Sequence, residues 1–374
     1  QLLDCTIRDG NYAVDFKFTE ADTILLTRRL SALGFRWIEV GHGVGLGGSE
    51  AGKGAMPATD ERVIRAAKSV SGESRIGVFF IPGIGRLDHL DRARDAGLDF
   101  VRIGENAPEV EKALPFVEHA RRRGLFPCVN MMKTYAISPE VFAQKAARAV
   151  EAGAEIVYCV DSAGSMLPED VSRYFDAARS VVKCPLGFHG HNNLMMVIAN
   201  SIEALRHGAR FVDVTLCGFG RSAGNAPTEI LLAVLERMGI RTGYDLFKVM
   251  DLVDQYMWPL VGRTRAHDML GVVSGYSQFH SSFLPKVLTA SRKYGADMRR
   301  LIARVAEHDP VTLDEKFMEQ AAEELKGTMQ HEPSDALVAF PTEGLSRDSV
   351  SNTWDGVKRL VEGLAVAAAK RPYT

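Results

Sequence analysis

The sequence predicts a (β/α)8 barrel followed by a helical C-terminal extension, and three observations support this fold class. Eight short runs rich in Val, Ile and Phe recur over about the first 240 residues, the usual span of such a barrel. The segments between them carry apolar residues at i, i+3, i+4 and i+7, the spacing of an amphipathic helix. Glycines stand where those helices should stop. A doubly wound open sheet is the alternative, but eight continuous buried strands give no sign of the edge that it requires.

The predicted strands, in order, are residues 2–7, 36–41, 75–81, 99–103, 126–132, 155–160, 185–189 and 211–217. Helical periodicity is clearest over residues 21–33, 139–152 and 194–207. Thr19, and Ser138 before Pro139, are start signals for two of these helices. The expected helix stops are Gly34, Gly97, Gly124, Gly153 and Gly208.

The alternation of strand and helix ends after Arg241. Residues 244–305 read as helices without intervening strands, and residues 312–326 add one more amphipathic helix. The next stretch, to about residue 352, is rich in Gly, Pro, Ser and Thr, and a final helix is expected over residues 353–370. We therefore assign residues 1–241 to the barrel, 242–326 to a helical C-terminal domain, and 327–374 to a loop with a terminal helix.

Composition excludes two classes of partner. The chain has 374 residues, of which 46% are hydrophobic and 25% charged, as in an ordinary globular protein. Its net charge is −2 and it has no long basic run, so nucleic acid is not an expected partner. No apolar stretch reaches the roughly 18 residues of a membrane span. Five cysteines without CxxC spacing indicate reduced thiols and a cytoplasmic location.

The motif His189-Gly-His191 follows a short apolar run and is the strongest candidate for a binding site. Histidines at i and i+2 of a strand point to the same side, so the two imidazoles can hold one metal ion. A carboxylate would complete one face of an octahedral site, and Asp9 is available after the first strand. The alternative is a pair of ordinary core or surface histidines.

Barrel enzymes place their chemistry where strands end, and nearly every predicted strand of this chain ends on a polar residue. Arg8 and Asp9 could form only a strand-end ion pair. Beside two histidines, however, Asp9 is favoured as a metal ligand and Arg8 as a partner for a substrate oxygen that gains negative charge, with Gly10 letting both side chains enter one site. Glu39 is either a structural carboxylate or a group that orients ligands. Ser162 either caps a helix or donates to a substrate carboxylate.

Five motifs together resemble the pyruvate-carboxyltransferase-like (HMG-CoA lyase-like) metallolyases. They are residues 4–10 (DCTIRDG), 38–43 (IEVGHG), 160–164 (VDSAG), 189–193 (HGHNN) and 224–227 (GNAP). The resemblance is greatest to the class II 4-hydroxy-2-oxovalerate aldolases, through the loop at 42–46, the turn at 82–85 and the Ser-Ser-Phe-Leu motif at 281–284. It covers about residues 2–326.

The resemblance implies a divalent metal, Mn²⁺ or Mg²⁺, held by Asp9, His189 and His191. Asn225 stands where some relatives place a further ligand. Pyruvate, as its enolate, is expected to chelate this metal through its keto and carboxylate oxygens.

The same resemblance implies which side chains contact the substrate. Arg8 is expected to stabilise the enolate and alkoxide oxygens, and Ser162 to hold the carboxylate, beside His189. A metal and an arginine also make chemical sense here, because both lower the free energy of a developing negative charge on the carbonyl oxygen.

The sequence departs from its relatives at the base that removes the 4-hydroxyl proton. The aldolases have a His two residues after Arg-Asp-Gly, where this chain has Tyr12. They also have an active-site Tyr just before the Ser-Ser-Phe-Leu motif, where this chain has His280, or Tyr276 by glycine spacing. His280 and Tyr276 are four residues apart, which on a helix would place them on one face. We therefore expect an exchange, with His280 as the base, Tyr12 as a polar contact and Glu39 in support. The alternative is that Tyr12 packs and His280 is a surface residue.

These features predict a metal-dependent carbon–carbon lyase that cleaves or forms a 4-hydroxy-2-oxoacid, with an aldehyde as the second component. The alternatives are an acyl-CoA-dependent condensing enzyme or lyase of the same superfamily and, less favoured, a non-catalytic barrel subunit. The resemblance over the C-terminal helices allows an acylating aldehyde dehydrogenase as partner, and a homodimer is also expected.

Overall fold

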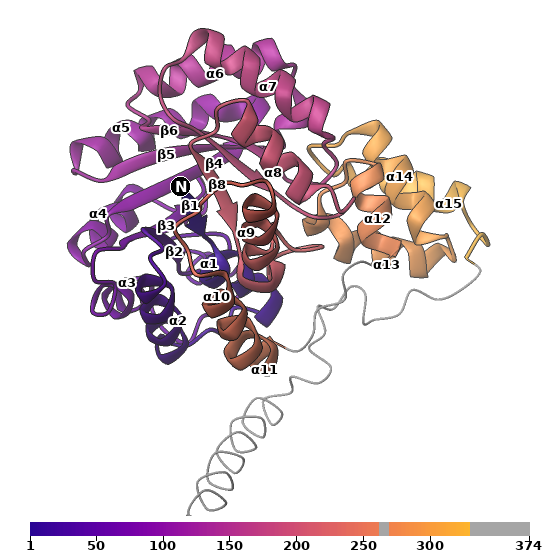
Figure 1. Cartoon of the computed structure of the whole chain (residues 1–374). Coiled ribbons are helices and arrows are strands. Elements are labelled where there is room, and N and C mark those ends of the chain that lie inside the picture. Colours follow the sequence, from indigo (N-terminus) through magenta and orange to yellow (C-terminus); the bar gives the residue numbers. More distant parts are fainter. Residues whose placement is uncertain (262–268, 330–374) are drawn as a thin grey trace, which may run out of the picture. The chain divides into compact units, whose positions relative to one another are not determined.

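A computed structural model describes residues 1–261 and 269–329 of the chain and contains a closed barrel of eight parallel strands (Figure 1). Each strand pairs with the next one in the sequence, and β8 pairs with β1. The predicted (β/α)8 barrel is therefore confirmed. The strands are β1 (Leu2–Asp4), β2 (Trp37–Val40), β3 (Arg75–Phe80), β4 (Phe100–Asn106), β5 (Phe126–Met132), β6 (Ile156–Asp161), β7 (Leu186–Gly190) and β8 (Phe211–Val214).

Eight helices follow the strands and form the outer layer of the barrel (Figure 1). They are α2 (Glu20–Ala32), α3 (Asp60–Lys68), α4 (Leu87–Asp95), α5 (Leu114–Arg122), α6 (Pro139–Glu151), α7 (Pro168–Val181), α8 (Val197–Arg206) and α9 (Thr228–Arg237). The predicted start signals are used: the hydroxyl of Thr19 accepts from the Asp22 N–H, and that of Ser138 from the Val141 N–H. All five predicted stop glycines have φ between +73° and +106°, where a side chain would be strained.

The first and last strands are shorter than predicted. β1 ends at Asp4, because the Asp4 carboxylate accepts hydrogen bonds from both the backbone N–H and the hydroxyl of Thr6, each at 3.0 Å, and turns the chain. Residues Thr6–Asp9 then form the single helical turn α1, which continues into the 3-10 turn η1 (Gly10–Val14). Arg8 and Asp9 therefore lie on a helical turn, which lets both side chains reach the same end of the barrel.

The inside of the barrel is layered. One layer is apolar and includes Trp37, whose ring contacts those of Phe100 and Phe211 at centroid distances of 5.1 and 5.2 Å. Side chains two residues further along a strand point the same way, so Glu39, Arg102 and Asp213 form the next layer toward the strand ends. Arg102 and Glu39 are completely buried there, and Asp213 nearly so.

Helices without strands follow residue 245, as predicted. They are α10 (Leu246–Leu252), the π-helical turn η5 (Val253–Met257), α11 (Trp258–Val261), α12 (Met269–Tyr276), α13 (Leu284–Tyr294), α14 (Met298–His308) and α15 (Glu315–Glu324). Four turns remain. Three of them, η2 (Ala107–Ala113), η3 (Thr134–Ala136) and η4 (Leu216–Gly218), lie in strand-to-helix connections, and η6 (Ser281–Phe283) precedes α13.

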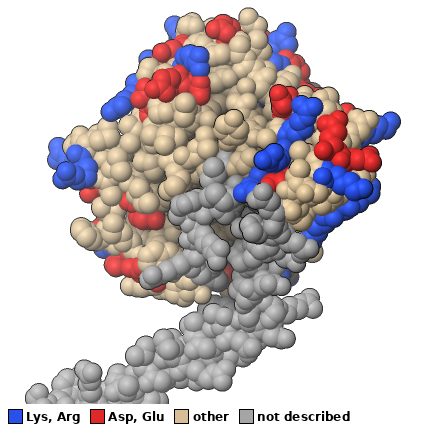
Figure 2. All heavy atoms as spheres, turned by 90° about the vertical axis from the view of Figure 1, so that its right-hand side faces the viewer, with Lys and Arg blue, Asp and Glu red and all other residues tan. Residues whose placement is uncertain are grey.

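The barrel and the later helices described here belong to one compact unit, and the domain boundary at residue 242 stays a prediction. The terminal helix predicted for 353–370 lies outside the described residues. On the face drawn in Figure 2, basic and acidic side chains lie beside one another. Among residues 1–261 and 269–329, every helix is too short or too polar to cross a membrane.

Candidate metal centre and active site

The two histidines of the His-Gly-His motif lie together at the end of β7, as the strand pattern predicts. Both are buried, and their ring centroids are 5.2 Å apart. Asp9 joins them from α1, with its Oδ2 3.6 Å from Nε2 of His189. One ligand atom from each residue lies within 4.8 Å of the other two. Ligands about 2.1 Å from one octahedral ion lie roughly 3 to 4 Å apart, so this spacing fits a single divalent cation.

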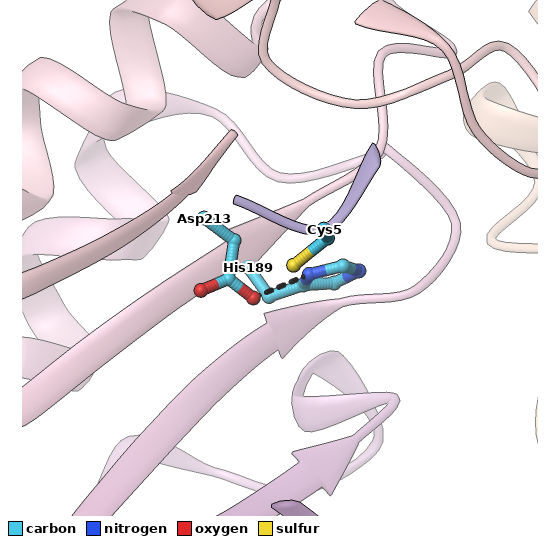
Figure 3. Close-up of side chains that lie close together, drawn as sticks. All are labelled: Cys5, His189 and Asp213. Atoms are coloured by element: carbon cyan, nitrogen blue, oxygen red, sulfur yellow. Dashed lines mark hydrogen bonds and ion pairs between the residues drawn. The ribbon is translucent and has the colours of Figure 1, made fainter. Parts of the chain in front are cut away.

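Hydrogen bonds at Nδ1 turn both imidazoles toward Asp9. His189 Nδ1 lies 2.7 Å from Oδ2 of Asp213 on β8, as Figure 3 shows. His191 Nδ1 lies 3.2 Å from the backbone carbonyl of Gly224. Since a carboxylate and a carbonyl only accept, Nδ1 carries the proton in each ring and Nε2 keeps a lone pair. This tautomer is the one that a metal ligand needs.

The charges of the cluster also suit a cation. Burial alone would raise the pKa of Asp9, but Arg8 and the two histidines hold it below its usual range, so the carboxylate is ionised. Burial and the neighbouring Arg221 lower the pKa of His191 to about 3, so its ring is neutral. An ionised carboxylate and neutral imidazoles are the protonation states that bind metal.

Two further observations show that the residues fit a metal ion. Among the described residues, no donor makes a hydrogen bond to either carboxylate oxygen of Asp9 or to Oδ1 of Asn225, although all three atoms are buried. Gly220 lies against the same atoms: a Cβ at this position would overlap Asn225 Oδ1 and lie 3.6 Å from Cγ of Asp9. The predicted ligands are thus brought together around a space that position 220 keeps open.

A second group of possible ligands, Cys5, His189 and Asp213, lies deeper in the barrel (Figure 3). In this group, the guanidinium of Arg102 supplies the positive charge that a metal ion would otherwise supply. The guanidinium of Arg102 donates to Sγ of Cys5 at 3.3 Å and to the carboxylate of Asp213. Burial and the nearby carboxylates raise the pKa of the Cys5 thiol well above its usual value, so it is protonated. This group is an ion-pair network that supports His189.

Glu39 holds Arg8 in the site. Its Oε2 accepts from Nε of Arg8 at 2.8 Å and from Nη1 of Arg102 at 2.9 Å. Arg8 also pairs with Asp9, at 3.3 Å between Nη1 and Oδ1. Glu39 was predicted to be either a structural carboxylate or a group that orients ligands. These contacts favour the second role, because Glu39 positions Arg8. Because a guanidinium has five N–H groups, Arg8 keeps donors for a substrate oxygen.

Ser162 follows β6, and its hydroxyl accepts a hydrogen bond from the backbone N–H of Lys133 at 2.9 Å. The residue is buried, and its own O–H proton stays available for donation. Lys133 follows β5, and its ammonium donates to the backbone carbonyl of Val311 in the connection between α14 and α15. Burial and then Arg221 lower the pKa of Lys133 to about 8.

His280 and Tyr12 both contact Arg221, a residue of the loop between β8 and α9. Nη1 of Arg221 lies 2.6 Å from Nε2 of His280, and its Nη2 lies 3.3 Å from Nε2 of His191. Its guanidinium stands 5.7 Å from the centre of the Tyr12 ring. Arg221 therefore links the candidate base to a candidate metal ligand.

Tyr276 is not brought into this group. It is the last residue of α12 and is 79% exposed. The expectation that it shares a helical face with His280 is wrong, because the helix ends at Tyr276 and Gln278 then adopts φ +58°. His280 lies in extended backbone beyond this turn, with Nδ1 2.7 Å from the hydroxyl of Ser282.

Four residues of the site were not among those predicted: Arg102, Asp213, Lys133 and Arg221. The first two could have been found from strand alternation, since a charged residue at an inward position of a barrel strand needs a buried partner. Lys133 stands at the end of a predicted strand, but its contacts, like those of Arg221, join segments that are distant in the sequence, and the sequence has no local signal for such contacts.

Comparison with known proteins identifies the family. Residues 1–255 match the HMGL-like family model. The chain belongs to the HMGL-like family. An oxaloacetate decarboxylase of Mycobacterium tuberculosis is 39% identical over 305 residues, which cover 82% of this chain and 90% of the relative. A 4-hydroxy-2-oxovalerate aldolase of Nocardia farcinica is 36% identical over 335 residues, covering 90% of this chain and 97% of the relative.

Solved structures with low sequence identity share the fold. An HMG-CoA lyase of Brucella melitensis superposes with a TM-score of 0.57 at 21% identity, covering 69% of this chain and 98% of the other. The carboxyl transferase domain of Rhizobium etli pyruvate carboxylase gives a TM-score of 0.71 at 13% identity, covering 87% of this chain and 61% of the other. Together with the curated relatives, the HMGL-like match shows that the chain is an enzyme, a carbon–carbon lyase.

Proposed function

We propose that this lyase is a divalent-metal-dependent aldolase that cleaves or forms a 4-hydroxy-2-oxoacid, with pyruvate as one component. The observation that carries the proposal is the convergence of Asp9, His189 and His191 beside Arg8, with ligand atoms within 4.8 Å of one another. The name of the Nocardia farcinica relative supports the same reaction class.

The metal, Mn²⁺ or Mg²⁺, would be held by Asp9, His189 and His191, with the buried Oδ1 of Asn225 as a fourth ligand. Once bound, such an ion supplies a Lewis acid that polarises the 2-oxo group. The resemblance of this chain to metal-dependent lyases supports a divalent metal. The choice between Mn²⁺ and Mg²⁺ is part of this proposal.

Arg8 and Ser162 act on the pyruvate part of the substrate. Arg8 is fixed by Glu39 at 2.8 Å and directs its remaining N–H groups at the oxygen that gains negative charge when the bond between C3 and C4 breaks. The hydroxyl of Ser162 donates to the C1 carboxylate, since its acceptor side already binds the Lys133 N–H. Both contacts orient the 2-oxoacid for cleavage.

His280 is the group that takes the proton from the 4-hydroxyl. Burial and then Arg221 lower its pKa well below its usual value, so its ring is neutral, and its Nε2 faces the Arg221 guanidinium at 2.6 Å. Burial raises the pKa of Tyr12 to about 12, so Tyr12 keeps its proton and serves as a hydrogen-bond donor. These protonation states support the exchange of roles between positions 12 and 280.

A pyruvate-release assay across several 4-hydroxy-2-oxoacids, with and without Mn²⁺, tests this function. We expect release that requires the metal and is lost in His191→Ala. His207→Ala is the matched control, because His207 is a half-buried histidine that pairs with Asp176 and Glu203 outside the site. Absence of release from every compound would overturn the aldolase proposal, and a requirement for a CoA thioester would favour an acyl-CoA-dependent enzyme.

Decarboxylation of a 2-oxo diacid is the second candidate, favoured by the name of the Mycobacterium tuberculosis relative. It breaks the same C3–C4 bond and leaves the same pyruvate enolate, but it needs no base because CO₂ leaves in place of an aldehyde. Carbon dioxide release from oxaloacetate, measured in the same samples, distinguishes the two reactions.

The acylating aldehyde dehydrogenase partner and the homodimer stay predictions. Analytical ultracentrifugation of the purified chain tests the second of these.

A further inference from the structure

Arg221 and its neighbours form a basic group beside the candidate metal centre. One side of its guanidinium faces His191 Nε2 at 3.3 Å and the other faces His280 Nε2 at 2.6 Å. The ammonium of Lys133 lies 5.4 Å from the centre of the Phe283 ring, and that ring centre lies 5.9 Å from the centre of the His280 ring. Nitrogen-bearing side chains from three different connecting segments thus lie near one another beside His191.

The two cations of this group have no acidic partner. Within residues 1–261 and 269–329, no carboxylate forms an ion pair with Arg221 or Lys133. The charge of Asp9 reaches Arg221, but Asp9 faces Arg8 and the two histidines. The charge of Asp309 reaches Lys133, but its carboxylate already accepts from Val311 and Thr312. A buried cation is costly unless it is paired, and Lys133 is only 6% exposed.

Arg221 and Lys133 are therefore two cations without an acidic partner, among the described residues, near the candidate metal centre. Such a pair is the complement of a carboxylate, because hydrogen bonds between a cation and a carboxylate are roughly twice as strong as neutral ones.

We propose that Arg221 and Lys133 form a second carboxylate subsite, and that the substrate is therefore a 4-hydroxy-2-oxo dicarboxylate. The first carboxylate and the 2-oxo group occupy the metal centre with Arg8 and Ser162. The second carboxylate, on C4 or beyond, pairs with Arg221 and draws its guanidinium away from His191 and His280. Binding of the diacid thus frees Nε2 of His280 for the 4-hydroxyl proton. This inference rests on the proposed aldolase function.

The reaction needs no further reactant. The C3–C4 bond breaks, its electron pair stays on C3 of the future pyruvate, the 4-hydroxyl proton passes to the base, and one proton returns to C3. The second carboxylate stays on the aldehyde product. This outcome favours aldol cleavage over decarboxylation, because a cation that binds the leaving carboxylate stabilises the ground state and opposes its loss as neutral CO₂.

Binding of two unreactive ligands tests the subsite directly. 2-Oxoglutarate and 2-oxopentanoate have the same chain length, both lack the 4-hydroxyl, and differ in the far carboxylate. We expect calorimetry with the Mn²⁺-loaded protein to show the diacid binding about 10- to 100-fold more tightly, as for a hydrogen-bonded charge. Arg221→Gln should reduce this ratio to near one, and Arg221→Lys should restore part of it. Arg122→Gln, at an exposed arginine of α5, should leave the ratio unchanged.

Equal binding of the two ligands to the wild-type protein, or a preference that survives in Arg221→Gln, would overturn the subsite. Measurement of pyruvate release then distinguishes a failure of the subsite from a failure of the aldolase proposal. Faster pyruvate release from 4-hydroxy-2-oxoglutarate than from 4-hydroxy-2-oxopentanoate supports both. A diacid preference in binding without pyruvate release from either compound supports the subsite and contradicts the aldolase. If CO₂ release from oxaloacetate depends on Arg221, the claim that the second carboxylate stays on the aldehyde product would be overturned.

Discussion

His189 and Asp213 are joined at 2.7 Å between Nδ1 and Oδ2, so that a carboxylate on β8 fixes the tautomer of a candidate metal ligand on β7. Asp213 is in turn held by Arg102, which also binds Glu39, the partner of Arg8. The candidate metal centre and Arg8, the arginine proposed to face the reacting oxygen, are therefore positioned by one buried network.

Asp213→Asn should lower Mn²⁺ affinity about 10- to 100-fold while the barrel stays folded. Arg102 and Nδ1 of His189 share one oxygen of Asp213, and the neutral amide lacks the negative charge that holds both groups there. Calorimetric titration with Mn²⁺ measures the affinity, and circular dichroism checks the fold. Asp176→Asn is the matched control, since Asp176 binds Nδ1 of a half-buried histidine outside the site at 2.7 Å. Unchanged affinity in Asp213→Asn would contradict the assigned role.

Gly220→Ala should reduce metal affinity by steric overlap alone. Its Cβ would collide with Oδ1 of Asn225, so the loop must shift or Asn225 must turn away. We expect at least about a tenfold weaker Mn²⁺ affinity, with the melting temperature of the metal-free protein nearly unchanged. The double variant Gly220→Ala/Asn225→Ala relieves the overlap, so its affinity reports whether Asn225 is itself a ligand. Wild-type affinity in the single variant would speak against a metal at this place.

Metal addition should stabilise the protein. A ligand at 100 times its Kd that binds only the folded state adds about 2.7 kcal/mol to the free energy of unfolding. We expect the melting temperature to rise with Mn²⁺ and to fall again with EDTA. In Asp9→Asn the rise should disappear, because the site loses its one carboxylate ligand. A rise of equal size in that variant would place the metal elsewhere.

His280→Ala should lower kcat by about 10²- to 10⁴-fold, the usual loss when a general base is removed. Tyr12→Phe should have the smaller effect, about tenfold, because it removes one hydrogen-bond donor. Tyr276→Phe serves as the control, since Tyr276 is 79% exposed. Values of kcat near that of the wild type in both site variants would contradict the exchange of roles between positions 12 and 280.

The kcat/KM of a dicarboxylate substrate should fall as the pH rises through about 8. The pKa of Lys133 is lowered to about 8 by burial and by Arg221, against the opposing charges of Asp309, Glu105 and Glu109. Below this pH the ammonium is charged and attracts the second carboxylate, and above it the attraction is lost. A monocarboxylate substrate should lack this step, and so should Lys133→Gln with the diacid. The same step for both substrates would assign it to another group.

Much of the fold and the centre of the site followed from the sequence because both depend on local patterns. Strand alternation placed His189 and His191 on one side, and the barrel brought Asp9 to them. β1 was predicted too long because Asp4 looks like a strand residue until its bonds to Thr6 are known. Tyr276 was predicted to share a helical face with His280 because the sequence does not show the turn between them. The residue with positive φ in this turn is Gln278 and not a glycine.

The remaining parts of the site depend on contacts across the fold. Arg221 meets His280 across 59 positions of the chain, and Lys133 meets Val311 across 178. The periodicity of a sequence does not predict contacts between residues so far apart in the chain. The basic group beside the candidate metal centre was therefore found only in the structure.

The burial of Arg102 between Glu39 and Asp213 has a practical consequence for redesign of this enzyme. The side chains that position the chemistry grow from the barrel wall, whereas Lys133, Arg221 and His280 come from connecting segments. Libraries that vary Lys133 and Arg221 can therefore seek new aldehyde acceptors while His280 and the buried network are kept. Substitutions at Arg102 would have the opposite result, because they would disturb the supports of His189 and Arg8 together.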